Sequence, residues 1–364
     1  DKAVKMDMLV QFMSRQSVPS KGLETASDYI QELLRTDISS EHLLRSLRST
    51  RVSLTGRPLG WIQAFGEEGM NLLLKHLREH RVKTGPTHHK IQHEIIRCLK
   101  AFMNNNFGLN LMMKSEDGLL LIAKSMYPED PSMMTDVVKL MAALCLVDHA
   151  KALVVITISG ESDENEKAGR FFNILSALKH SDSVQLKVAC VQFINALVSK
   201  PDDLDFRLHL RNEFLRGGLT EVLKDLREIG NDELNVQLDI FDEHKEDDFL
   251  ELSHRLTDVQ VNFEEPLELF QMLVSITKDS VSENAFVSIL QHLLLIRDDA
   301  YARTQYFNLI EECVSQIVLH KSGADPDFAA TKKFEIDVER LIDNMVDKAK
   351  VTEYMDKANS LETK

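Results

Sequence analysis

The sequence has few of the residues that make tight turns and cross-links. It contains 14 glycines and 8 prolines in 364 residues, too few for an all-β protein with many turns. Its four cysteines, Cys98, Cys145, Cys190 and Cys313, lie among apolar neighbours and form no C-x-x-C pair. We therefore expect reduced core cysteines in a cytosolic protein, not a secreted domain held by disulfides.

Signatures of catalysis are lacking too. The sequence has no G-x-x-x-x-G-K-S/T phosphate loop, no G-x-S-x-G elbow and no H-E-x-x-H motif. His76 and His80 have the spacing of a metal site, but no cysteine or carboxylate stands at a suitable distance, so we interpret them as surface histidines. Carboxylates fall in solvated runs and not in isolated apolar pairs. We expect no enzymatic activity, no metal and no cofactor.

The charge balance is acidic. There are 43 basic and 58 acidic residues, a formal net charge of −15, and no basic run of convincing size. Phosphate backbones and anionic lipids repel such a chain, so we expect no binding to nucleic acid. No apolar run is long enough to span a bilayer. Acidic faces suit a partner that carries a basic segment.

What the sequence does contain is a recurring apolar helix built around a small residue. Four such segments cover residues 93–103, 136–146, 186–198 and 286–296. Ala101, Ala143 and Ala196 stand at equivalent places in the first three, and spacings of roughly forty to fifty residues are typical of armadillo and HEAT arrays. Each helix is apolar around most of its circumference and needs neighbours on several sides. The pattern predicts an all-α, right-handed armadillo/HEAT-like solenoid.

Three regions depart from this repeat. Residues 1–55, with amphipathic segments at 6–13 and 26–34, predict an N-terminal helical extension of the 56–320 array. Residues 152–159 are rich in β-branched residues, and we expect a loop or distorted helix there. Residues 321–364 include an amphipathic helix from Phe334 onward without a local partner, which favours pairing with another chain. Because the chain begins at Asp1, we expect a fragment of a longer protein.

Two short motifs are open to two interpretations. Asn104-Asn105-Asn106 follows Met103 at a helix end, where asparagines either cap the helix or form a rigid surface for a partner. Asn195 and Ala196 interrupt a strongly apolar helix. A small residue there provides close packing between repeats, or a groove floor that a partner helix approaches.

Longer blocks carry a family resemblance. Residues 92–105 (QHEIIRCLKAFMNN), 204–207, 241–243, 289–295, 309–320 and 325–328 closely resemble the N-terminal region of diaphanous-related formins. This resemblance implies an N-terminal segment that binds a Rho-family GTPase in its GTP form. It also implies an armadillo inhibitory domain that captures the C-terminal autoregulatory helix of the same formin, and a dimerisation region that makes a homodimer. Actin nucleation would belong to C-terminal domains absent here, in a cytoplasmic protein of the cytoskeleton and cell cortex.

The resemblance also assigns site residues. The GTPase contact corresponds to Met103, Asn104, Asn105 and Asn106, although a lysine is expected at the last position. The residues expected in the groove for the autoregulatory helix are Phe193, Asn195, Ala196, Leu197, Gln237 and Gln291. An acidic patch for the basic tail of that helix is expected at Asp242, Glu243, Glu246, Asp247 and Asp248. The alternative is an armadillo adaptor of the nuclear-import or vesicle-coat kind, which reads peptides without GTPase control.

Overall fold

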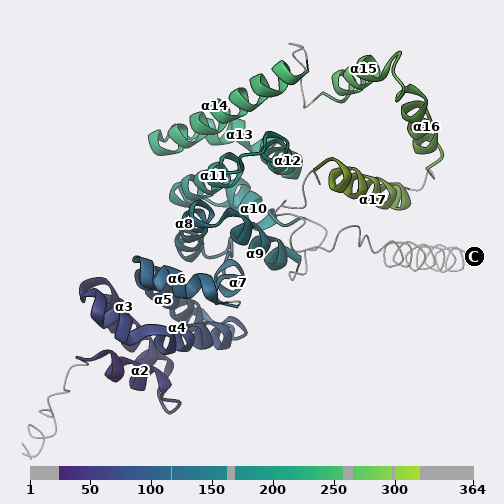
Figure 1. The fold of residues 1–364 in the computed structure, drawn as a ribbon. Coiled ribbons are helices and arrows are strands. Elements are labelled where there is room, and N and C mark those ends of the chain that lie inside the picture. Colours follow the sequence, from purple (N-terminus) through teal and green to yellow (C-terminus); the bar gives the residue numbers. More distant parts are fainter. Residues whose placement is uncertain (1–23, 116, 162–168, 257–264, 297–299, 320–364) are drawn as a thin grey trace, which may run out of the picture. The chain divides into compact units, whose positions relative to one another are not determined.

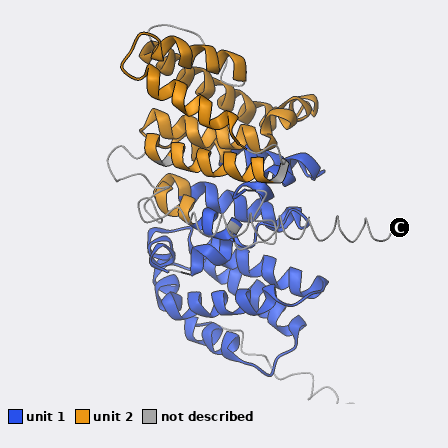
Figure 2. Cartoon of the chain, turned by 90° about the vertical axis from the view of Figure 1, so that its right-hand side faces the viewer, with its two compact units in different colours: residues 1–144, 155–193 blue, residues 145–154, 194–364 orange. Residues whose placement is uncertain are grey.

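Every described element of the chain is helical, which confirms the predicted all-α class. The computed structural model describes residues 24–115, 117–161, 169–256, 265–296 and 300–319 (Figure 1). They divide into unit 1, residues 1–144 with 155–193, and unit 2, residues 145–154 with 194–364 (Figure 2). Within the described ranges, no helix combines the length and the apolarity that crossing a membrane requires. Segment 6–13 and the predicted dimerisation region 321–364 lie outside the described residues.

Unit 1 is built around one central helix. Helices α3 and α4 both pack on α5, and α2 packs on α4. Residues on several sides of α5 are buried, among them Ile91, Ile96 and Phe102, as its nearly continuous apolar surface predicts. The helices of this unit are α2 (Ala26–Leu34), α3 (Ser40–Gly56), α4 (Leu59–Arg81), α5 (Pro86–Phe102), α6 (Asn106–Lys114), α7 (Gly118–Ala123) and α10 (Phe172–His180). Helices α8 (Pro131–Val147), α9 (His149–Glu161) and α11 (Val184–Ser199) contribute residues to both units.

The predicted inner helices coincide with observed ones, and of the loop or distorted helix expected at residues 152–159 the loop is excluded. Segments 93–103, 136–146 and 186–198 fall on α5, α8 and α11, and segment 26–34 is α2. Residues 152–159, by contrast, belong to helix α9. Ala152, Leu153 and Ile156 are buried there. Apolar packing outweighs the modest helix penalty of their β-branched neighbours.

Two glycines set the path of unit 1. Gly66 has φ +48° inside α4 and kinks the helix at a conformation that side chains disfavour. Gly108 lies in the first turn of α6, where an added Cβ would stand 1.9 Å from the carbonyl oxygen of Phe102. Only glycine therefore lets α6 begin so close to the end of α5.

Unit 2 is organised around the long helix α14. Helices α12 and α13 pack on it, and Phe214, Leu226 and Phe241 form part of the core. Its remaining elements are α12 (Leu204–Phe214), a π-helical turn (Leu215–Leu219), α13 (Thr220–Glu228), α14 (Asp232–Arg255), α15 (Pro266–Thr277), α16 (Glu283–Leu294) and α17 (Ala300–Leu319). The fourth predicted inner segment, 286–296, falls largely on α16.

Candidate functional site

The asparagine turn joins two helices through a single side chain. Asn105 Nδ2 donates to the carbonyl oxygen of Phe102 at 2.9 Å, and its Oδ1 accepts from the backbone N–H of Gly108 at 2.9 Å. The residue thus caps the end of α5 and the beginning of α6 together. Asn104 and Asn106 are exposed, whereas Met103 is buried. The side chain of Met103 therefore packs inside the protein and is not available to a partner, contrary to the expectation that it contacts the GTPase.

Asn104 and Asn105 line a groove of about 710 Å³ in unit 1, here called the asparagine groove. Its wall is formed by α3, α4, α5 and α8, through Arg51, Leu54, Thr55, Arg57, Leu59, Ile62, Arg97, Lys100, Ala101, Asn104, Asn105 and Asp136. Four of these residues are cations and one is an acid. This excess of positive charge is local, because the whole chain carries −15.

The four cations differ in how strongly the protein already neutralises them. Arg51 is bonded to the buried carboxylate of Glu94, and that hydrogen bond raises the pKa of Arg51. Arg97 and Lys100 share Asp136. Arg57, exposed just beyond α3, makes no ion pair with a described residue. Beside them Leu59 is half exposed, so the groove combines cationic and apolar surface.

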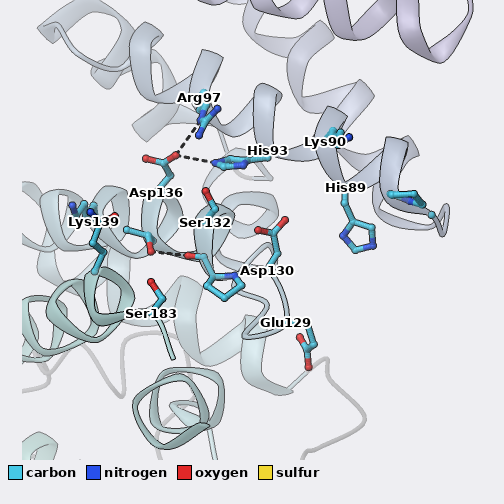
Figure 3. A pocket seen from close by; sticks show the side chains of 15 residues that line it. His89, Lys90, His93, Arg97, Glu129, Asp130, Ser132, Asp136, Lys139 and Ser183 are labelled. Carbon is cyan, nitrogen blue, oxygen red and sulfur yellow. Dashed lines mark hydrogen bonds and ion pairs between the residues drawn. The ribbon is translucent and has the colours of Figure 1, made fainter. Parts of the chain in front are cut away.

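Asp136 connects α8 to three successive turns of one face of α5. Its carboxylate lies 3.0 Å from His93 Nε2, 3.4 Å from Arg97 Nε and 2.7 Å from Lys100 Nζ. Figure 3 shows the first two of these contacts. Burial acts to raise the pKa of Asp136, but the hydrogen bonds from His93 and Lys100 outweigh it and hold the pKa well below its ordinary value.

A second, polar groove lies on the other side of this contact. It has a volume of about 1090 Å³ and is lined by residues of α5 and α8 and by residues at and just before the start of α11, including His89, Lys90, Lys139 and Ser183 (Figure 3). Arg97 and Asp136 line both grooves. His93 faces only this polar groove, and Lys100 lines only the asparagine groove.

Helix α11 presents one of its predicted groove residues to the surface. Phe193 and Leu197 are fully buried, so the expectation that they face a partner is wrong. Asn195 is 6% exposed, and its Nδ2 donates to the carbonyl oxygen of Gln237 at 2.8 Å, which ties α11 to α14. Ala196 is partly exposed, as is Gln237, and Gln291 is exposed on α16.

Only part of the acidic patch predicted on α14 is exposed in the structure. Asp248 is buried beside the fully buried Arg211, whose Nη2 lies 2.6 Å from Asp248 Oδ2. Arg207 Nε donates to Asp248 Oδ1 at 2.8 Å, so this carboxylate is not available to a basic tail. Asp242 pairs with Arg227 at 2.6 Å. Glu243, Glu246 and Asp247 remain exposed.

The histidines of α4 correct another expectation. His76 and His80 are buried, not on the surface. His76 Nε2 lies 2.8 Å from the carbonyl oxygen of Leu33, and His80 Nδ1 lies 2.8 Å from His88 Nδ1. Burial, assisted by Lys83 and His88, lowers the pKa of His80 to about 4. No cluster of three or more histidine, cysteine or acidic residues within the described ranges is placed to hold a metal.

The residues that sequence reasoning missed are Arg57, Lys100 and Asp136. The cations of the asparagine groove are spread over fifty residues, so no basic run marks them in the sequence. One signal was present: His93, Arg97 and Lys100 recur at i, i+4 and i+7 on the side of the helix opposite Ile91 and Ile95. Such a polar stripe on a buried helix indicates an open face.

Comparisons with known proteins identify both parts of the chain. Residues 6–146 match the Diaphanous GTPase-binding Domain, and residues 154–337 match the Diaphanous FH3 Domain. Protein diaphanous homolog 2 of Homo sapiens is 48% identical over 372 residues, which cover 98% of this chain and 33% of that protein. Protein diaphanous of Drosophila melanogaster is 40% identical over 345 residues, which cover 91% of this chain and 31% of that protein.

A solved structure agrees with the fold. The crystal structure of E. histolytica Formin1 bound to EhRho1-GTPgammaS matches with a TM-score of 0.53 at 18% identity, over 71% of this chain and 88% of that chain. The chain spans about a third of the length of its curated relatives. The matched domains are regulatory and non-catalytic. The chain therefore belongs to the diaphanous-related formins, of which it carries the GTPase-binding and FH3 regulatory domains.

Proposed function

We propose that this chain is a regulatory module that binds a Rho-family GTPase in its GTP form at the asparagine groove and captures an autoregulatory helix of the same formin on unit 2. The observation that supports GTPase binding most strongly is a cationic groove, half apolar, within an acidic chain. It lies in the region matched by the GTPase-binding domain. A related formin of E. histolytica was crystallised with EhRho1-GTPgammaS, which supports the same partner class here.

Groove chemistry favours a partner with carboxylates around an apolar centre. Arg57 has no competing acid in the described residues, and Lys100 is only about half exposed. Leu59 and the exposed amide of Asn104 supply apolar contact and hydrogen bonds beside them. The proposal requires that a switch segment has the matching shape only in the GTP form, since a ligand shifts an equilibrium only through differential affinity.

Unit 2 carries the features expected of a surface for an amphipathic helix. Leu146 and Val147 at the end of α8, and Val236 on α14, are more than half exposed. Ala196 supplies a small surface residue on α11. Burial of three or four apolar side chains at about 1.5–3 kcal/mol each, less the ordering cost, is compatible with sub-micromolar affinity. A basic tail would meet Glu243, Glu246 and Asp247.

Release of the autoregulatory helix by the GTPase then follows from negative coupling between the two binding sites. If GTPase binding weakens capture of the helix, capture of the helix must weaken GTPase binding by the same factor. Actin would be reached only through C-terminal domains of the whole formin, and the parent protein would act as a homodimer at the cytoskeleton and cell cortex. A peptide-reading adaptor without GTPase control is the alternative, and it would bind a peptide but show no nucleotide-dependent binding of a Rho protein.

A charge reversal tests the assigned groove. Arg57→Glu should weaken binding of a GTPγS-loaded Rho protein by at least about tenfold, because it replaces a cation that pairs with none of the described acids by an acid. Arg45→Glu is the matched control, since Arg45 is exposed on α3 outside the groove. Titration calorimetry compares the two. Equal affinities for the two variants would place the GTPase elsewhere.

A further inference from the structure

We propose that Asp136 competes with the acidic groups of a partner for Lys100 and Arg97, and that it keeps these two cations paired until such a partner binds. This inference rests on the proposed function. Asp136 is the single acid among the residues that line the asparagine groove. It comes from α8, whereas the cations that it neutralises come from α5.

The geometry makes the competition direct. Asp136 Oδ1 accepts from Lys100 Nζ at 2.7 Å, while Oδ2 faces Arg97 and His93. Lys100 and Arg97 are 48% and 41% exposed, so both can turn toward a ligand without leaving the groove. Asp136 itself is only 19% exposed. A partner carboxylate therefore meets a cation already paired with an acid, and must displace that acid to bind fully.

Displacement of Asp136 from Lys100 and Arg97 also changes the charge in the polar groove. Once Lys100 and Arg97 turn to the partner, the carboxylate keeps only His93, which faces the polar groove. The acid that neutralised the asparagine groove then adds negative charge to the polar groove (Figure 3). Occupancy of one groove by an acidic group thus disfavours an acidic group in the other. Asp136 thereby couples the two grooves through a shared charge.

Asp136→Asn tests the proposal because it removes the competitor and retains the side-chain size. Its affinity for a GTPγS-loaded Rho protein should rise roughly 3- to 10-fold at low salt, and the gain should shrink as ionic strength approaches that of 0.3 M salt. Asp117→Asn is the control, since Asp117 pairs with Arg78 and lines neither groove. The gain should shrink in Asp136→Asn combined with Lys100→Gln, because one of the two cations that pair with Asp136 is then gone.

Three results would overturn the idea: unchanged affinity in a folded Asp136→Asn variant, weaker affinity, or an equal gain in the Asp117→Asn control. Circular dichroism establishes folding, and Asp136→Ser replaces the asparagine variant if that variant is unfolded. A peptide of ten glutamates serves as a second probe of the groove. If wild-type protein binds no Rho protein, the proposed function fails, and the glutamate peptide still decides whether Asp136 competes for acids.

Discussion

Asn105 holds Phe102 by a hydrogen bond from its side-chain amide to the backbone carbonyl, at 2.9 Å. The same side chain accepts from Gly108 and so begins the next helix. The neighbouring Asn104 makes no such bond, is exposed and lines an open groove. Of these adjacent asparagines, Asn105 thus stabilises the turn and Asn104 forms part of the exposed surface.

This division predicts opposite effects of two alanine substitutions. Asn105→Ala should destabilise the protein by about 1 kcal/mol, the usual cost of losing a helix cap, as measured by urea unfolding. Asn104→Ala should leave stability unchanged within about 0.5 kcal/mol and weaken binding of the GTPγS-loaded Rho protein. If Asn104→Ala binds normally, that amide is not part of the contact surface.

A charge at Ala196 should block capture of the autoregulatory helix. Ala196→Asp places a carboxylate that the bound helix would desolvate, so affinity for a peptide of that helix should fall by about tenfold or more. Ala196→Ser adds little volume and no charge, and should bind nearly as wild type. Fluorescence anisotropy with a labelled peptide measures both. Normal binding by the aspartate variant would move the helix site away from α11.

The buried pair on α12 and α14 predicts a large stability effect. Asp248→Asn leaves Arg211 charged and fully buried without its counter-ion, so the free energy of unfolding should fall by about 3–5 kcal/mol. Asp247→Asn, at the exposed position next to it, should change stability by less than about 0.5 kcal/mol. Similar midpoints in urea for both variants would show that Arg211 does not depend on Asp248.

His80 predicts a loss of stability in mild acid. Its pKa is about 4 in the folded protein, against 6.5 for the exposed side chain. Between these values the unfolded chain binds the extra proton, so stability is complete above about pH 6.5 and falls as the pH is lowered toward 4. From pH 7.5 to pH 5 the loss is about 2 kcal/mol.

The variant His80→Gln should flatten that part of the pH profile of unfolding. His89→Gln, at an exposed position of α5, should leave it in place. Urea titrations at pH 7.5, 6 and 5 give the profile. A wild-type protein that is equally stable at all three values would contradict the burial of a neutral His80.

The sequence predicted the helices well because apolar periodicity and burial have the same cause. Helix α5 was expected from its apolar residues, and Ile91, Ile95 and Phe102, which recur at i, i+4 and i+11 on one face, are indeed buried. Composition was a weaker guide at residues 152–159, where the β-branched side chains suggested a loop or a distorted helix while packing stabilises a helix.

Site residues were harder to predict than helices. Resemblance indicated the region around Asn105, but it could not distinguish a capping amide from an exposed one. Phe193 and Leu197 share helix α11 with Ala196, yet both are buried whereas Ala196 is partly exposed. Arg57, Lys100 and Asp136 meet because α3, α5 and α8 are adjacent, a relationship between distant segments that no local pattern contains.

Nucleotide-dependent binding tests the central claim most directly. A Rho protein is loaded with GTPγS or with GDP, and each form is titrated into this chain at the same salt concentration. Preference for the GTPγS form by at least about tenfold is the expected result, and it should be lost in Arg57→Glu. Equal affinity for the two forms, or binding that survives reversal of the groove charge, would contradict the account.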